Sequence, residues 1–295
     1  MSNKLLIKSG VSDILFISNF QEKVMSVKLI ASDLDGTLMA PDHLTVTEKT
    51  KSALLKAHNK GIKLAIATGR TLHFTDNVTE QIPFVDYVIC SNGAAVYDRN
   101  TNQYIYKNLI SAEDTEQTVK FLNKYPVYYN VYIDGLIYLQ KGIDKFFINP
   151  DLPQCFIDAF AKFATHCDDI VSAVSGKSAE LIDIFASDKE SHDAIIEYCL
   201  KKNFILASAA PGVNSATAAN VDKGNALRGI MKHLGINADE LMTFGDAHND
   251  CPMLELAGYS FAMDNGVDEC KKTAKFIAPS NGEDGVAQMI EKYAL

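Results

Sequence analysis

Apolar runs of four or five residues alternate with amphipathic stretches over the first and last thirds of the chain. Runs of this length between polar or glycine residues are typical of strands buried in a parallel sheet. We expect such strands at 27–31, 63–67, 87–90, 241–244, 259–263 and near 276. Between the first two, the pattern predicts a helix that opens with a capping box at Thr45–Glu48 and ends near Lys60, before Gly61. Strand, helix and strand at this spacing indicate a right-handed parallel crossover.

The middle of the chain follows a different pattern. A hairpin is predicted at 94–97 and 104–107, and helices and strands then mix without parallel alternation from Ser111 to Gly212. Asp134-Gly135 is a strong hairpin signal, and Ser111 and Ser187 are the expected helix caps. Helices are expected from 111 onward and at 152–166 and 187–202, and strands at 127–133, 136–140, 170–174, 180–186 and 204–209. This stretch has its own apolar faces and is predicted as an inserted α+β unit.

The parallel pattern resumes near residue 213. Asp222 is expected to cap a helix over 223–234 that stops at Gly235, and another helix is expected near Cys251. The predicted fold class is therefore α/β, a doubly wound parallel-sheet core with an inserted α+β cap domain. The predicted division is an N-terminal extension at 1–26, a core at 27–110 and 213–295, and a cap at 111–212.

The N-terminal extension has no pattern that predicts a targeting signal. Lys4, Lys8 and Asp13 interrupt its apolar residues, so no signal-peptide core forms. Met25 stands two residues before the first predicted strand and would be a natural start. We expect the extension to be peripheral to the fold, or an upstream extension of the reading frame.

Composition narrows the class of protein. A chain of 295 residues with 47% hydrophobic content can bury one or two ordinary cores, and no apolar run approaches the ~18 residues of a membrane span. The six cysteines are scattered without a Cys-x-x-Cys pair, which argues against zinc and a disulfide scaffold and favours the cytoplasm. A net charge of −9 disfavours a nucleic-acid surface. We expect a monomer or a small homo-oligomer.

Two aspartates follow the first predicted strand, in the sequence Asp33-Leu34-Asp35-Gly36-Thr37. Alternate residues that leave a strand point to the same side, so Asp33 and Asp35 can converge on one site. Two carboxylates repel each other unless a cation or a shared proton lies between them, and Mg²⁺ is a hard ion that takes oxygen ligands. The alternative is a solvated acidic turn, but the five-residue pattern arises by chance only on the order of once in 10^5 positions.

Three further loops are expected at the same edge of the sheet. They are Thr68-Gly69, Lys223 and Asp246-x-x-Asn249-Asp250. This set of loops, in this order, resembles the haloacid dehalogenase superfamily of phosphotransferases. The size and place of the insert, with Ser91-Asn92-Gly93-Ala94 and the Lys223-Gly224 pair, look like the Cof-type capped phosphatases. The resemblance covers about residues 27–295.

The resemblance implies roles for the acidic residues. Asp33 would be the nucleophile that accepts the phosphoryl group, and Asp35 would be the general acid and base. Mg²⁺ would be held by the carboxylate of Asp33, the backbone carbonyl of Asp35 and the carboxylate of Asp246. Asp250 would pair with the lysine or support the metal.

Donors around the phosphate are implied in the same way, because phosphoryl transfer depends on positioning and charge neutralisation. The expected donors are the Leu34 N–H, Thr68, the Gly69 N–H, Lys223 and Asn249. Arg70 and Asn92 are candidate substrate contacts. These residues have rival interpretations: Thr68 could merely precede a helix at 71–81, and Arg70 could cover the sheet edge. His248 lies between motif residues but is expected to be a solvated loop residue.

The function that the resemblance implies is Mg²⁺-dependent hydrolysis of small phosphorylated metabolites. A large cap would cover the opening and favour small substrates such as sugar phosphates over phosphoproteins. The tyrosines at 125, 128, 129 and 132 are expected mainly to pack the hairpin rather than to contact substrate. Two alternatives remain open: a phosphomutase of the same superfamily, and a binding module that kept the fold and lost turnover.

Overall fold

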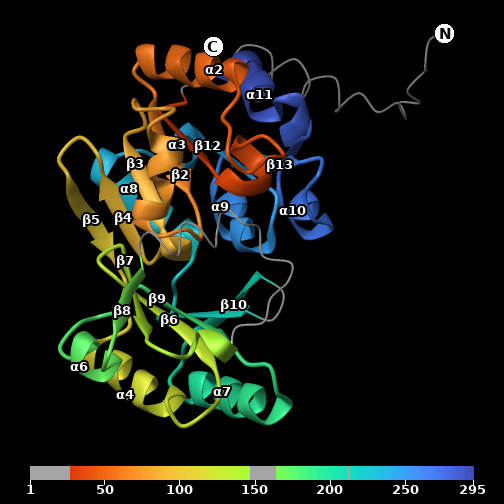
Figure 1. The fold of residues 1–295 in the computed structure, drawn as a ribbon. Helices are drawn as coiled ribbons and strands as arrows, with labels where there is room; N and C mark the ends of the chain where they lie inside the picture. Colours follow the sequence, from red (N-terminus) through yellow and green to blue (C-terminus); the bar gives the residue numbers. More distant parts are fainter. Residues whose placement is uncertain (1–26, 147–163, 211–212) are drawn as a thin grey trace.

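Two β-sheets organise the protein, and each carries its own helices (Figure 1). The computed structural model describes residues 27–146, 164–210 and 213–295. The strands of the first sheet are β1 (Leu29–Ser32), β2 (Lys63–Ala67), β3 (Tyr87–Cys90), β4 (Ala95–Asp98), β5 (Gln103–Lys107), β12 (Leu241–Gly245), β13 (Tyr259–Met263) and β14 (Phe276–Ala278). Their order is β14-β13-β12-β1-β2-β3-β4-β5, parallel from β14 to β3 and antiparallel for β4 and β5.

Helices cover both faces of this sheet. They are α2 (Glu48–Asn59), α3 (Asp76–Thr79), α8 (Lys223–Leu234), α9 (Cys251–Leu256), α10 (Asp268–Thr273) and α11 (Gly285–Tyr293). Neighbouring residues of β1 point to opposite faces, so Ile30 packs in the core under α2 and α11 while Leu29 packs in the core under α8. Burial on both faces is why the strands have continuous apolar runs, and it confirms the predicted doubly wound α/β class.

The second sheet is built from the middle of the chain. Its strands are β6 (Tyr128–Ile133), β7 (Leu136–Gln140), β8 (Ala164–Cys167), β9 (Leu181–Phe185), β10 (Ile205–Ala210) and β11 (Val213–Thr217). Their order is β10-β11-β9-β6-β7-β8, and the helices are α4 (Ala112–Leu122), α6 (Ile170–Val174) and α7 (Lys189–Lys201). In Figure 1 these helices lie on the side of the second sheet that faces away from the first sheet.

Most predicted elements are present, but several details differ. The expected strand at 170–174 is the helix α6, because Asp169 accepts the N–H groups of Val171 and Ser172 and caps a helical turn. Of the expected helix at 152–166, residues 152–163 lie outside the described part of the chain, and Ala164 to His166 belong to β8.

Two predicted caps are displaced, and one predicted helix is broken. The cap of α2 is Thr47 rather than Thr45, and that of α7 is Asp188 rather than Ser187, in each case because this side chain accepts an N–H of the first turn. The expected helix at 71–81 is a short turn (Leu72–Thr75) followed by α3.

The division into extension, core and cap remains a prediction, because residues 1–26 lie outside the described part of the chain. Strand β11, which that division assigned to the core, pairs with β9 and β10 in the second sheet. No helix in the described ranges combines the length and apolar content that crossing a membrane requires.

Candidate active site

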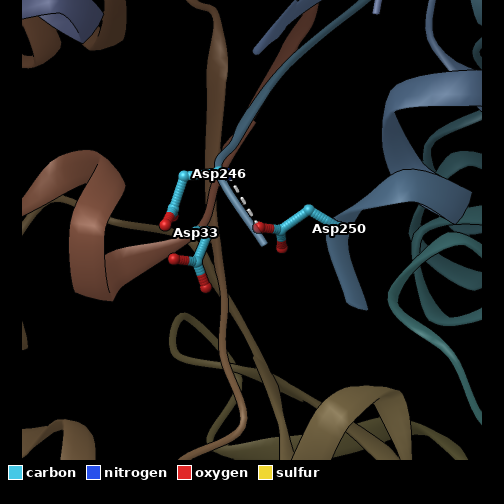
Figure 2. Close-up of side chains that lie close together, drawn as sticks. All are labelled: Asp33, Asp246 and Asp250. Atoms are coloured by element: carbon cyan, nitrogen blue, oxygen red, sulfur yellow. Dashed lines mark hydrogen bonds between the residues drawn. The ribbon is translucent and has the colours of Figure 1, made fainter. Parts of the chain in front are cut away.

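Three carboxylates meet where strands β1 and β12 end (Figure 2). The two strands pair in parallel, so Asp33, directly after β1, lies beside Asp246, directly after β12. Asp250, four residues after Asp246, completes the cluster, and one carboxylate oxygen from each lies within 4.8 Å of the others. Parallel neighbours deliver their following residues to the same sheet edge, and the convergence expected for Asp33 and Asp246 is therefore present.

A buried lysine joins two of these carboxylates. The Lys223 Nζ donates to Oδ1 of Asp33 and to Oδ1 of Asp250, each at 2.6 Å. Lys223 is the first residue of α8, where a cation opposes the helix dipole unless anions are close. Burial lowers the pKa of Lys223, but the carboxylates of Asp250 and Asp33 outweigh burial and raise it, so the ammonium stays charged.

Asp250 is fixed by hydrogen bonds on both of its oxygens. Oδ1 accepts from Lys223, and Oδ2 accepts the backbone N–H groups of Asp246 and Ala247 at 2.9 Å each. A Cβ on Gly245 would lie 2.4 Å from the Cβ of Asp250, so only glycine fits beside it. Asp250 therefore shapes the loop and orients the lysine, as expected of a supporting residue.

The charges of the cluster fit a cation that is bound by oxygen. Burial raises the pKa of Asp33 well above its usual range, and Asp250 and Asp246 add to this against the opposing charge of Lys223. Burial likewise raises the pKa of Asp246, against a 2.6 Å hydrogen bond from the Thr37 hydroxyl. Three carboxylates around one lysine leave excess negative charge, and carboxylate oxygens are the ligands of hard divalent cations.

Gly36 lets the loop after β1 pass close to Asp246. Its φ of +84° lies in the left-handed region, and an added Cβ would lie 2.5 Å from Oδ2 of Asp246. Asn265 donates to the Gly36 carbonyl at 2.8 Å and holds this turn in place. Gly36 and Thr37 belong to the motif after the first strand, but their contacts with Asp246, and that of Asn265 with Gly36, were not expected from the sequence.

Asp35 lies outside the carboxylate cluster and pairs with Arg70. Two hydrogen bonds join them, from Nη2 to Oδ1 at 2.6 Å and from Nε to Oδ2 at 2.9 Å, and Nδ1 of His43 lies 3.2 Å from Oδ1. Neither expected interpretation of Arg70, a substrate contact or a cover for the sheet edge, included this pairing with Asp35, and the substrate contact stays a prediction. The contact of His43 with Asp35 was not expected from the sequence, because His43 lies in an irregular turn and belongs to no motif.

The remaining predicted residues gather at the ends of β2, β3 and β12. Thr68 is buried, and its hydroxyl accepts the Arg70 N–H at 3.1 Å. The Asn249 amide donates to Oδ1 of Asn92 at 3.0 Å, and the same oxygen would lie 3.1 Å from a Cβ on Gly69.

Two other predictions concern exposure and burial. Leu34 buries its side chain in the core, so only its backbone is available to a ligand. His248 is exposed, as expected of a solvated loop residue.

The second sheet reaches this edge through its β6–β7 hairpin. The Ser91 hydroxyl, after β3, donates to Glu180 at 2.8 Å, and Glu180 also accepts the Gly135 N–H at 3.1 Å. A Cβ on Gly135 would lie 3.3 Å from the Cβ of Leu72, so the hairpin turn packs against the segment that follows Arg70. Glu180 was not expected from the sequence, since no motif contains it.

Comparisons with known proteins agree with this architecture. The sequence pattern of the haloacid dehalogenase-like hydrolase family matches residues 30–290. Among curated relatives, the 5-amino-6-(5-phospho-D-ribitylamino)uracil phosphatase YcsE of Bacillus subtilis is 26% identical over 276 residues, which are 93% of this chain and 99% of the relative. Phosphatase YwpJ of Bacillus subtilis is 28% identical over 284 residues, which are 90% of this chain and 99% of the relative.

A solved structure shares the fold. A haloacid dehalogenase-like hydrolase from Bacteroides thetaiotaomicron superposes with a TM-score of 0.77 at 23% identity, and the match covers 90% of this chain and 99% of that one. The match spans both sheets, so the combination of a parallel sheet and an inserted unit is common to the two proteins.

Proposed function

The chain belongs to the haloacid dehalogenase-like hydrolase family, in its Cof-type branch, and we propose that it is a Mg²⁺-dependent phosphatase that acts on small phosphomonoesters through a phosphoryl group carried on Asp33. The family and the relatives named as phosphatases support the reaction class. The observation that carries the mechanism is the buried Lys223, which holds Asp33 and Asp250 beside Asp246.

In the first step, an oxygen of Asp33 attacks phosphorus while the bond from phosphorus to the leaving oxygen breaks. Lys223 engages Oδ1 of Asp33, and no hydrogen bond reaches Oδ2 from the described residues, which supports Oδ2 as the attacking atom. Asp35 gives its proton to the leaving alkoxide. In the second step, water attacks the phosphorus, Asp35 takes the proton of that water, and Asp33 is released as a carboxylate.

The ion pair with Arg70 prepares Asp35 for the second step. Two hydrogen bonds from the Arg70 guanidinium fix the position and orientation of the Asp35 carboxyl group, which can then accept a proton from water. Proton donation in the first step requires the pair to open. We therefore assign Arg70 as a residue that positions Asp35, rather than as a direct contact to the substrate's leaving group.

The phosphate would be held by groups at the same sheet edge. These are Lys223, the Thr68 hydroxyl, the Asn249 amide and the N–H groups of Leu34 and Gly69. The carboxylates of Asp33 and Asp246 and the backbone carbonyl of Asp35 would hold Mg²⁺, which when bound neutralises charge on the phosphoryl oxygens. Asp250 is excluded from this set because both of its oxygens already accept hydrogen bonds.

The test is a phosphomonoester panel, measured with Mg²⁺ and with EDTA. Asp33→Asn and Asp35→Asn should each lower turnover at least about a hundredfold, as removal of a nucleophile or an acid–base group does. Asp168→Asn is the matched control, because that side chain is exposed and lies directly after β8 of the second sheet. Hydrolysis by Asp33→Asn at the unmodified rate would refute the mechanism.

Hydroxylamine distinguishes hydrolysis from a mutase reaction. An acyl phosphate on Asp33 should react with hydroxylamine during turnover in the unmodified protein and not in Asp33→Asn. A phosphatase releases inorganic phosphate without a bisphosphate activator. Slow release accompanied by isomerisation of a sugar phosphate would instead indicate the phosphomutase.

A further inference from the structure

A row of polar side chains interrupts one face of the second sheet. Tyr128, Asn130 and Tyr132 alternate along β6 and therefore share a face. Asn130 lies opposite Asp183 of β9, and Asp183 lies opposite Ser215 of β11. Three adjacent strands thus place five polar side chains side by side.

This row faces the first sheet. The alternate residues of the same strands, such as Tyr129 and Ile182, pack in the core formed with α4, α6 and α7. Tyr132 belongs instead to a cluster with Ile137 and Leu181, and Phe74, from the segment after β2, packs against this cluster. Figure 1 agrees, because the second sheet lies between its own helices and the first sheet.

The row is linked to the proposed acid–base residue through Phe74 and Arg70. Phe74, which packs against the cluster that contains Tyr132, accepts a hydrogen bond from Nη1 of Arg70 on its carbonyl at 3.5 Å. The same guanidinium pairs with Asp35. A leaving group that takes a proton from Asp35 would therefore extend toward this row.

The row contains a buried acceptor without a donor, next to a carboxyl group. Asp183 accepts the Tyr132 hydroxyl at 2.7 Å and the Ser215 hydroxyl, and burial raises the pKa of its carboxyl group against these two hydrogen bonds. Oδ1 of Asn130 is buried and accepts no hydrogen bond within the described part of the chain. Asp183 keeps partial exposure among buried neighbours, so a polar molecule can reach the row there. A buried acceptor without a donor is costly, and a purely structural network would satisfy it.

We propose that Asn130 and Asp183 bind the leaving group of the substrate by accepting hydrogen bonds, so that the preferred substrates are phosphomonoesters whose alcohol carries hydroxyl or amino donors. This inference rests on the proposed phosphatase function and specifies its substrate class. Tyr132 and Ser215 orient the Asp183 carboxylate, and the apolar clusters around Phe185 and Leu181 flank the polar centre on the same sheet face.

The experiment compares esters of equal chain length with and without donors. Sorbitol 6-phosphate and glucosamine 6-phosphate carry hydroxyl or amino groups, and n-hexyl phosphate carries none. The readout is the ratio of kcat/KM between a donor-bearing ester and n-hexyl phosphate, which does not depend on the active fraction of a preparation. Asp183→Asn replaces one acceptor by a donor and should lower the ratio about 10- to 100-fold, as leaving a buried hydrogen-bonding group without its partner does.

Asn130→Leu is the second variant, because it removes the unpartnered acceptor without changing charge. Tyr132→Phe and Tyr129→Phe form a matched pair on one strand: each loses a hydroxyl, but only Tyr132 contacts Asp183. The ratio should fall in Tyr132→Phe and stay constant in Tyr129→Phe. Equal ratios for unmodified protein, Asp183→Asn and Asn130→Leu would overturn this inference while leaving the phosphatase intact. Failure of the unmodified protein to hydrolyse any ester would instead refute the proposed function.

Discussion

Gly36 offers a test of how closely the loop after β1 must approach Asp246. Alanine at this position meets two obstacles: a φ of +84° and a Cβ that would lie 2.5 Å from Oδ2 of Asp246. Gly61 is a matched control, since its φ is +85° and nothing lies within 4 Å of its added Cβ. Gly61→Ala therefore measures the backbone strain alone, and Gly36→Ala measures the strain together with displacement of Asp246.

The two variants should both lose stability, but only Gly36→Ala should lose most of its activity. Left-handed strain costs about 1–2 kcal/mol in either variant, which lowers Tm by about 2–8 °C in a chain of this size. Gly36→Ala should lose up to about 3 kcal/mol more, because moving the carboxylate breaks its bond from Thr37. Displacing a group at the reacting centre by about 1 Å costs on the order of 10²-fold in rate. We therefore expect kcat/KM to fall about a hundredfold in Gly36→Ala and less than about twofold in Gly61→Ala.

The assay is steady-state hydrolysis at several Mg²⁺ concentrations, with thermal unfolding of the same preparations. Gly36→Ala should also need more Mg²⁺ for half-maximal activity, since Asp246 is a proposed ligand. If both variants keep similar kcat/KM and similar Mg²⁺ requirements, Asp246 is not held at a catalytic position by this turn, and the reasoning fails.

Three further predictions follow from the charges of the site. Because the folded-state pKa of Asp33 is raised, its protonated form stabilises the metal-free protein at acid pH, and that stability is lost as pH rises from about 4. In EDTA, Asp33→Asn should therefore have a higher Tm than the unmodified protein, and the difference in Tm should widen toward pH 8. A difference in Tm that stays constant with pH would contradict this. Arg70→Gln should lower kcat about 10- to 100-fold and alter its pH profile with little change in KM, because it frees Asp35; a change confined to KM would indicate a substrate contact. Asp250→Ala should lower the free energy of unfolding by about 3–5 kcal/mol, since it removes a buried partner of Lys223 and two loop hydrogen bonds. Denaturant unfolding measures this loss, and a loss below about 1 kcal/mol would show that Asp250 does not hold the loop.

Local patterns predicted the first sheet well. The expected strands at 63–67, 87–90 and 259–263 match β2, β3 and β13 residue for residue. Strands buried on both faces need short continuous apolar runs, and breakers at each end mark where the chain leaves the sheet. The convergence of Asp33 and Asp246 followed from the same rule, because parallel neighbours end at one edge.

The second sheet was harder to predict. The apolar run at 170–174 has no period that separates strand from helix, and the capping hydrogen bonds of Asp169 decide for a helix. Strand β11 has the sequence Val-Asn-Ser-Ala-Thr, which gives little apolar signal, and pairing with β9 and β10 on either side makes it a strand. Tyr128 and Tyr132 were expected mainly to pack the hairpin, and only the sheet register places Asn130 and Asp183 beside them.

The sequence by itself determined the doubly wound sheet and the identity of the acidic and basic residues at its edge, since both depend on spacing along the chain. Tertiary structure alone decided which charges pair. Lys223 contacts Asp33 across 190 residues, and Asp35 turns away from that pair toward Arg70. An ion pair depends on the positions of side chains brought together by the packed sheet and its loops, and no periodicity in the sequence records those positions.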